Sequence, residues 1–388
     1  MKNEQLKEVF KSDFYTGIKV NEISGRYVAN RDLNIVRKKL ENIFPSEKIG
    51  ESVEGRSIYK FQIGNGERKI LIWSQMHGNE STTTKAVFDL LNFLSLDDKN
   101  SLGLEILNSC TLYIIPILNP DGAKAYTRVN ANSIDLNRDL QDLSQPESKL
   151  LKKIYYEFKP DFCLNLHDQR TIFSAGDVPK TATLSFLTPS KDEERNIDES
   201  RRLSMAVIAK IAEDLDEFLS GHIGRYDDGF NINCAGDTFQ NLSTPTILFE
   251  AGHSKDDYER EETRMQVFRA LISAICQISK SGIDTSDYEK YFKIPENRKL
   301  FNDLIIRNAS VKGKIRDVSI QFKELRKGEK IEFVPIIEKI APEISNYGHR
   351  EIDAEENTIK LPDNSEIIEN VIVNKIILNN EELEVKLR

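Results

Sequence analysis

Three features that mark particular protein classes are missing from this 388-residue sequence. No apolar run reaches the ~18 residues that a membrane-spanning helix needs, and the N-terminus lacks the apolar core of a signal peptide. Acidic residues (63) outnumber basic ones (54), and the two signs are interspersed, so the sequence offers no basic face for nucleic acid. We therefore expect a cytoplasmic protein with no membrane and no nucleic-acid partner.

Cysteine is also scarce, with four residues and no Cys-x-x-Cys pair. Scattered cysteines in apolar segments indicate free thiols in a reducing compartment rather than a disulfide framework or a thiolate metal site. The sequence has neither a G-x-G-x-x-G nor a Walker motif, which disfavours a nucleotide-binding fold. The cysteines are Cys110, Cys163, Cys234 and Cys276.

Strands and helices are expected to alternate along the first 280 residues. This order predicts an α/β fold with a mixed, mostly parallel sheet and helices on both faces. The dipeptide Asn65-Gly66 predicts a hairpin that joins strand 58–63 to the strand ending before His77. The other expected strands are 69–73, 112–117, 162–166 and 246–249, and the expected helices are 29–44, 81–94, 146–158, 196–218 and 258–279.

The composition changes near residues 279–282, and the remaining chain is expected to be rich in strands. Residues 318–322, 330–334 and 371–378 are predicted strands, and a turn is expected at 361–364. We predict a domain at 1–285 and a small β-rich domain at 286–388. No motif indicates a role for the second one.

The tetrapeptide His77-Gly78-Asn79-Glu80 lies where a buried strand is expected to end and a helix to begin. A His and a Glu three residues apart across such a turn can point at the same position. Zn²⁺ accepts this nitrogen and oxygen pair, and a catalytic zinc site needs one further protein ligand and an open position. The alternative is that both residues only cap the helix, because acidic residues suit a first turn.

Further polar segments follow His77-Gly78-Asn79-Glu80 in a specific order. They are Asn119-Pro120-Asp121-Gly122, Arg128, Asp135-Leu136-Asn137-Arg138-Asp139, Asn165-Leu166-His167 and Phe249-Glu250-Ala251-Gly252. In this order and spacing they resemble the zinc metallocarboxypeptidases, the carboxypeptidase A-like family, over about residues 50 to 280. The resemblance implies a zinc carboxypeptidase-like α/β fold and one Zn²⁺ per chain, held by His77, Glu80 and His167. It also implies hydrolysis of a C-terminal peptide bond.

The sequence contains five histidines. His167 follows an apolar strand, which would bring its imidazole out at the edge of the sheet. We expect His222 and His349 at the surface, and His253 either lines the pocket or lies in the core.

The resemblance implies specific roles for the polar residues between the two metal-binding segments. Asp135 would accept a hydrogen bond from His77 and fix its tautomer, although an Asx-turn is the alternative. Arg128 would polarise the scissile carbonyl and stabilise the oxyanion. Asn137 and Arg138 would hold the substrate's terminal carboxylate, because a guanidinium fork matches a planar anion. Salt bridges within the protein are the alternative for both arginines.

Glu250 is the expected general base and acid, unless it is only a surface residue at a strand end. Tyr226 lies 24 residues earlier, a distance similar to that of the family's substrate-binding loop tyrosine, although its flanking residues depart from the family pattern. Asp237 falls near the stretch that forms the specificity pocket and would favour a basic terminal residue. Arg170 and Arg225 would instead favour an acidic one.

We therefore expect a zinc-dependent metallocarboxypeptidase that acts on a peptide or peptide-like substrate with a free C-terminal carboxylate. One alternative is an N-acyl amino acid amidohydrolase similar to succinylglutamate desuccinylase and aspartoacylase, which share a start like His77-Gly78-Asn79-Glu80. The segments at 119–122 and 135–138 favour the carboxypeptidase. The other alternative is a catalytically degenerate protein that only binds peptides.

Overall fold

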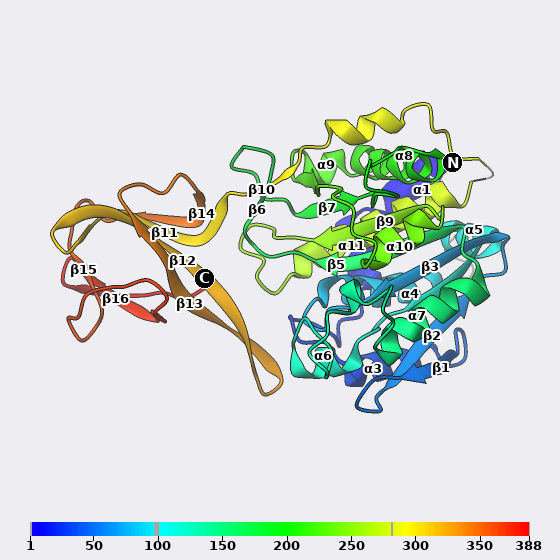
Figure 1. The fold of residues 1–388 in the computed structure, drawn as a ribbon, viewed down its shortest axis with the longest axis horizontal. Helices are drawn as coiled ribbons and strands as arrows, with labels where there is room; N and C mark the ends of the chain where they lie inside the picture. The colour runs from blue at the N-terminus through cyan, green and yellow to red at the C-terminus, as the bar shows by residue number, and fades with distance from the viewer. Residues whose placement is uncertain (1, 97–100, 281, 388) are drawn as a thin grey trace.

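A computed structural model describes residues 2–96, 101–280 and 282–387 (Figure 1). Within them the largest sheet has eight strands in the order β1-β2-β4-β3-β5-β9-β7-β8. The strands are β1 (Ser46–Glu51), β2 (Ser57–Ile63), β3 (Arg68–Ser74), β4 (Cys110–Ile115), β5 (Phe162–Asp168), β7 (Leu184–Leu187), β8 (Ile223–Arg225) and β9 (Thr246–Ala251).

This sheet is mixed and mostly parallel, as predicted. Among the described strands, four neighbouring pairs are parallel and three are antiparallel. The consecutive strands β4, β3, β5 and β9 all run in the same direction. Their carboxyl ends therefore meet at one edge, which is where open α/β sheets place their ligands.

Helices cover both faces of the sheet. Alternate side chains of the central strands point to opposite faces, so both faces carry apolar residues that the helices bury. Ile70 and Ile72 pack with α4, α8 and α11, whereas Leu71 and Trp73 pack with α7 and α10. The helices of this part are α3 (Asn30–Leu40), α4 (Thr82–Leu94), α5 (Ser101–Ser109), α6 (Pro120–Ala125), α7 (Pro146–Phe158), α8 (Glu199–Asp214), α9 (Asp216–Leu219), α10 (Ala235–Asn241) and α11 (Glu261–Ile278), with 3₁₀ helices η1 (Leu136–Arg138) and η2 (Tyr288–Lys293).

The N-terminal segment contains helices α1 (Lys2–Val9) and α2 (Ser12–Ile18). It is hydrogen-bonded to a buried ion pair that joins α4 and α11. Arg264 on α11 and Asp89 on α4 lie 2.6 Å apart, and both side chains are fully buried. Asp89 also accepts hydrogen bonds from the Tyr15 hydroxyl and the Val20 amide, and Arg264 donates to the carbonyl oxygens of Val20 and Ile23. The segment is thus part of the main core.

The hairpin predicted at Asn65-Gly66 is wrong. Strands β2 and β3 are not paired, because β4 lies between them in the sheet. The amides of Asn65 and Gly66 instead donate to the carbonyl oxygens of Leu107 and Cys110. A Cβ atom on Gly66 would lie 1.9 Å from the Ser109 backbone, so the glycine serves a close backbone contact rather than a two-residue turn.

The chain after η2 is rich in strands, and Figure 1 shows these strands, orange to red, gathered at one end of the molecule. One sheet has the order β13-β12-β11-β14, another has β15-β16-β17, and β10 pairs with β6 of the preceding part. The division of the chain near residue 285 stays a prediction. The bounds are β6 (Phe173–Ala175), β10 (Asn297–Lys299), β11 (Phe301–Val311), β12 (Lys314–Lys327), β13 (Lys330–Ala341), β14 (Tyr347–Asp353), β15 (Ile359–Lys360), β16 (Lys375–Leu378) and β17 (Glu381–Glu384).

Candidate metal and catalytic site

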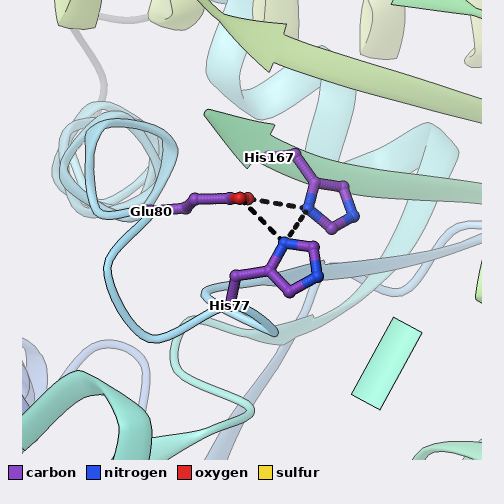
Figure 2. A group of neighbouring side chains, drawn as sticks. All are labelled: His77, Glu80 and His167. Carbon is purple, nitrogen blue, oxygen red and sulfur yellow. Dashed lines mark hydrogen bonds and ion pairs between the residues drawn. The ribbon is translucent and has the colours of Figure 1, made fainter. Parts of the chain in front are cut away.

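Three side chains converge at the carboxyl edge of the central strands, and Figure 2 shows them pointing at one another. His77 Nδ1 lies 2.8 Å from Glu80 Oε1, and His167 Nδ1 lies 2.8 Å from Glu80 Oε2. The two Nδ1 atoms are 3.1 Å apart. Possible ligand atoms of these three buried residues all lie within 4.8 Å of one another, so they could share one metal ion.

The turn that carries His77 and Glu80 is held in place by the segment at 119–122. Asn119 Nδ2 donates to the Met76 carbonyl oxygen, just before His77. A Cβ atom on Gly78 would lie 1.9 Å from the Gly122 backbone, so only glycine permits this approach. The geometry of the turn therefore depends on contacts that bear no catalytic group.

His167 is the penultimate residue of β5, and the register of the sheet places Glu250 of β9 directly beside it. Glu250 Oε2 is buried and has no hydrogen-bond partner among the described residues. Burial raises the pKa of Glu250 well above its usual value, and the nearby carboxylates of Glu80 and Asp168 add to this effect. A proton is therefore held more strongly on Glu250 than on an ordinary glutamate.

Asp135 lies on the far side of the first imidazole, with Oδ1 3.0 Å from His77 Nε2. A carboxylate in this position fixes the proton on Nε2, so the Nδ1 lone pair points at the Glu80 carboxylate. Lone pairs facing each other at 2.8 Å repel unless a proton or a metal cation lies between them. The donor set therefore fits a divalent cation such as Zn²⁺.

The pKa values of the three clustered residues follow from burial and from their mutual charges. Burial opposes ionisation of Glu80, but His77 and His167 outweigh it and hold the pKa of Glu80 well below its usual range. Burial also disfavours the protonated form of His77, yet Glu80 and Asp135 raise its pKa. Burial lowers the pKa of His167, which keeps this imidazole neutral and able to act as a ligand.

Arg128 is half-exposed and reaches the same centre. Its Nε lies 3.0 Å from Asp135 Oδ2, and one Nη lies 3.2 Å from Glu80 Oε1. The structure thus places this guanidinium beside the Glu80 carboxylate of the candidate metal site and at the wall of the cavity.

Asn137 and Arg138 lie in η1, next to the start of α10. Asn137 Oδ1 accepts a hydrogen bond from the Ala235 amide at 2.9 Å, which turns the Nδ2 end of the amide away from that backbone. Arg138 is exposed and donates to the Asn137 carbonyl oxygen at 2.7 Å and to Cys234 Sγ at 3.1 Å. Both residues line the same cavity as His77, Glu80 and His167.

The remaining predicted residues divide between the cavity and other surfaces. Tyr226 lines the cavity and donates from its hydroxyl to Gln169 at 2.7 Å, and Asp237 also lines the cavity. Burial raises the pKa of Asp237 to about 6. Arg170 lines the cavity as well, whereas Arg225 is occupied by an ion pair with Glu296 at 2.9 Å.

One expectation about histidines needs correction, and the structure decides between the two alternatives left open for His253. His349 is not a free surface residue: it is half-buried, stacks on Phe301 at 4.6 Å and donates to the Thr171 carbonyl oxygen. Burial lowers the pKa of His349 to about 4. His253 is buried in the core, with its ring 4.4 Å from the His349 ring and 4.7 Å from the Tyr258 ring, and it does not line the cavity.

The cavity has a volume of about 800 Å³, and sequence reasoning missed one side of it. Strands β12 and β13 contribute Phe322, Glu324 and Phe333 to its wall. Arg26, from the N-terminal segment, also lines it and pairs with Asp168, the residue after His167. No local pattern marks these positions, because they reach the cavity only through contacts between distant parts of the chain.

Comparison with known proteins agrees with this geometry. Residues 30–169 match the family model described as zinc carboxypeptidase. The resemblance to the zinc metallocarboxypeptidase family is confirmed. The match includes His77, Glu80 and His167, whereas Glu250 lies beyond its end.

Curated relatives carry the same family name. The chain is 30% identical over 149 residues to a probable carboxypeptidase 2 of Trichophyton verrucosum, covering 37% of this chain and 28% of that protein. It is 28% identical over 135 residues to the human carboxypeptidase N catalytic chain, covering 29% of this chain and 30% of that one. The chain thus spans less than a third of the length of these relatives.

Solved structures show a similar fold. Carboxypeptidase A from Helicoverpa armigera matches with a TM-score of 0.54 at 16% identity, covering 72% of this chain and 82% of that one. Bovine thrombin-activatable fibrinolysis inhibitor, solved in complex with tick carboxypeptidase inhibitor, matches with a TM-score of 0.52 at 13% identity, covering 65% and 97%. The predicted carboxypeptidase-like α/β fold is confirmed, and the family is one of hydrolases. No helix among the described residues has both the length and the apolar character needed to cross a membrane.

Proposed function

We propose that this protein is a zinc-dependent carboxypeptidase that hydrolyses the last peptide bond of a peptide with a free C-terminal carboxylate. The observation that carries the proposal is the convergence of His77, Glu80 and His167 at 2.8 to 3.1 Å, with Glu250 on the adjacent strand. His77, Glu80 and His167 would hold one Zn²⁺ through Nδ1, a carboxylate oxygen and Nδ1. A bound zinc ion would supply a Lewis acid that polarises the scissile carbonyl and acidifies water.

Glu250 would act as the general base and then as the general acid. Its buried carboxylate has an oxygen with no partner among the described residues, so that oxygen is available to take a proton from the attacking water. The raised pKa lets Glu250 hold this proton and then deliver it to the leaving amine nitrogen. The same carboxylate therefore serves both halves of the reaction.

Arg128 would hold the oxyanion that develops on the scissile carbonyl, because its guanidinium lies at the wall of the cavity beside Glu80. Asp135 would keep both Arg128 and the His77 imidazole in position through its two oxygens, each at 3.0 Å. Tyr226 would contribute a hydrogen bond to the substrate from the cavity wall.

Arg138 and Asn137 would bind the terminal carboxylate. The exposed guanidinium of Arg138 can form two charge-assisted hydrogen bonds with a planar anion. The Asn137 oxygen is already bonded to Ala235, so the Nδ2 donor is the end of the amide that remains for the substrate. Asp237, buried in the wall near this clamp, would contribute to the choice of terminal side chain.

Peptide binding is supported by the relatives. Bovine thrombin-activatable fibrinolysis inhibitor, which shares the fold, was solved with a carboxypeptidase inhibitor bound. The comparisons do not favour the amidohydrolase of the N-acyl amino acid type. Asn137 and Arg138 give a physical reason to prefer the carboxypeptidase, since together they can bind the terminal carboxylate of a peptide.

The proposal is tested by replacing the base and varying the substrate. Glu250→Gln should keep its zinc, measured by elemental analysis, and lose turnover on blocked dipeptides by about 10²–10⁴-fold, because an amide cannot accept the proton. Glu157→Gln, at an exposed position of α7, is the matched control and should behave as wild type.

The substrates include each dipeptide with a free and with an amidated C-terminus. Near-normal turnover by Glu250→Gln would remove the base assignment, and equal cleavage of amidated peptides would remove the carboxylate clamp. Faster hydrolysis of N-acetyl or N-succinyl amino acids than of any dipeptide would favour the amidohydrolase instead.

A further inference from the structure

The hairpin formed by β12 and β13 lies against the α/β part and is fastened there at its tip. Ile331 packs on a small cluster of Tyr27, Ala29 and Tyr126. The Arg326 guanidinium lies 4.7 Å from the centre of the Tyr27 ring. An ion pair between Arg31 and Glu329 adds a further contact at the turn.

Nearer the cavity, Glu324 of β12 is the partner of the buried Arg26. Its carboxylate accepts from an Arg26 Nη at 3.2 Å and from the Tyr126 hydroxyl. Arg26 is only 5% exposed, and a second Nη pairs with Asp168 at 3.4 Å. Because buried charged side chains must be paired, this part of the hairpin has one defined position.

A second set of polar contacts fastens the start of the hairpin. Asp303 of β11 is buried and accepts hydrogen bonds from Tyr258 at 2.9 Å, from the Phe322 amide at 2.6 Å and from Gln321. Gln321 also donates to the Thr171 hydroxyl, in the loop after β5, at 2.7 Å. The hairpin is thus held on both sides of the stretch that lines the cavity.

Between these two attachments the wall is aromatic. The Tyr258 ring lies 5.9 Å from Phe322 and 5.6 Å from Phe333, in edge-to-face arrangements. Ile336 follows on β13, and all four side chains line the cavity that contains the metal-binding group. We call Tyr258, Phe322, Phe333 and Ile336 the aromatic wall.

Hydrogen bonds and ion pairs show how the parts of the cavity follow one another from the carboxylate clamp to the hairpin. Asn137 is bonded to the start of α10, and Asp135, two residues before it, contacts His77. On the other side, Asp168 follows His167 and pairs with Arg26, which pairs with Glu324 of the hairpin. The metal-binding group therefore lies between the carboxylate clamp and the hairpin.

We propose that the aromatic wall binds the substrate residue that precedes the scissile bond and selects a large apolar side chain there. This inference rests on the proposed function: when the terminal carboxylate is held at Asn137 and Arg138 and the scissile bond lies at the metal-binding group, the preceding residue points to the hairpin. A cavity wall of aromatic and aliphatic side chains that is fixed in place favours an aromatic or aliphatic side chain of the substrate. The hairpin is then part of the active site.

The test compares two blocked dipeptides with the same terminal residue, N-acetyl-Phe-Xaa and N-acetyl-Gly-Xaa, where Xaa is the best terminal residue of the wild type. Wild-type kcat/KM should be at least about tenfold higher for the Phe peptide. Phe333→Ala should lose most of this preference, because its kcat/KM should fall much more for the Phe peptide than for the Gly peptide. Phe333→Leu should restore part of the preference, and Leu325→Ala, an exposed position of the same hairpin outside the cavity, should keep all of it.

Binding of both peptides to the zinc-loaded Glu250→Gln protein, measured by calorimetry, separates this inference from the proposed function. If the Phe peptide binds more tightly than the Gly peptide but the wild type hydrolyses neither, the proposed hydrolysis is refuted and side-chain binding by the aromatic wall is supported. If the wild type hydrolyses both peptides equally well, the aromatic wall does not select the substrate residue. The same conclusion follows if Phe333→Ala and Phe333→Leu both keep the wild-type preference for the Phe peptide.

Discussion

Removal of Asp135 should weaken zinc binding although this residue would not touch the ion. In Asp135→Ala the His77 imidazole loses the carboxylate 3.0 Å from its Nε2, so nothing fixes the proton there and Nδ1 is no longer held as the free lone pair. Partners of this kind are worth about 10–100-fold in metal affinity. That range corresponds to about 1.4–2.7 kcal/mol of binding free energy.

The geometry gives two reasons to expect the upper part of this range. Asp135 also orients Arg128 through a contact of 3.0 Å, and it accepts the Asn137 amide at 2.9 Å. Loss of the Asp135 carboxylate therefore loosens the loop that carries Asn137 and Arg138, and it also frees the His77 imidazole. Asp135→Asn keeps an acceptor but removes the charge, so its zinc affinity should fall between those of Asp135→Ala and wild type.

The assay is competition for zinc with a chromogenic chelator, which needs no turnover. Asp142→Ala, an exposed position a few residues further along the same loop, is the control and should bind zinc as wild type does. A dissociation constant for Asp135→Ala within twofold of wild type, with folding intact by circular dichroism, would refute the assignment of Asp135 as the partner of His77.

Two further predictions concern the attachment of the hairpin. Arg26→Met leaves Asp168 and Glu324 without their shared cation and should lower the free energy of unfolding by about 3–5 kcal/mol. Arg31→Met, which removes the α3 partner of Glu329 at the exposed hairpin tip, should cost about 1 kcal/mol or less. Urea denaturation measures both, and equal losses would contradict the role of Arg26. Burial raises the pKa of Asp303 from 3.8 to about 6, so the folded protein holds a proton that the unfolded chain releases. Stability should therefore fall by about 3 kcal/mol as pH rises from about 4 through 6, a loss that Asp303→Asn should lack. If the free energy of unfolding changes with pH in the same way for wild type and Asp303→Asn, the raised pKa of Asp303 is not the cause.

The parts of the fold that the sequence predicts well are those governed by local pattern. The apolar run at 69–73 is β3, and the helical spacing after Ser81 is α4. Because the motif at 77–80 lies between these two strong signals, its position at the strand end follows directly. The order of the polar segments then carries the resemblance.

Register and long-range contacts are the parts that local pattern does not encode. Asn65-Gly66 has the composition of a tight turn, yet the insertion of β4 between β2 and β3 excludes the hairpin. Phe322 and Phe333 read as ordinary strand residues, and only the pairing of β12 with β13 and its docking on the α/β part bring them to the cavity. Arg26 has no neighbouring motif, since its partners lie at residues 168 and 324.

The fastening of the first two helices decides where this polypeptide can be shortened for expression or crystallisation. A version beginning after Ile23 would strip Tyr15 and Val20 from Asp89 and would open to solvent a guanidinium–carboxylate contact that is now fully enclosed. Because α4 and α11 share that contact, the damage would spread to the helix that starts beside Glu80. Trimming from this side should therefore stop well short of Tyr15.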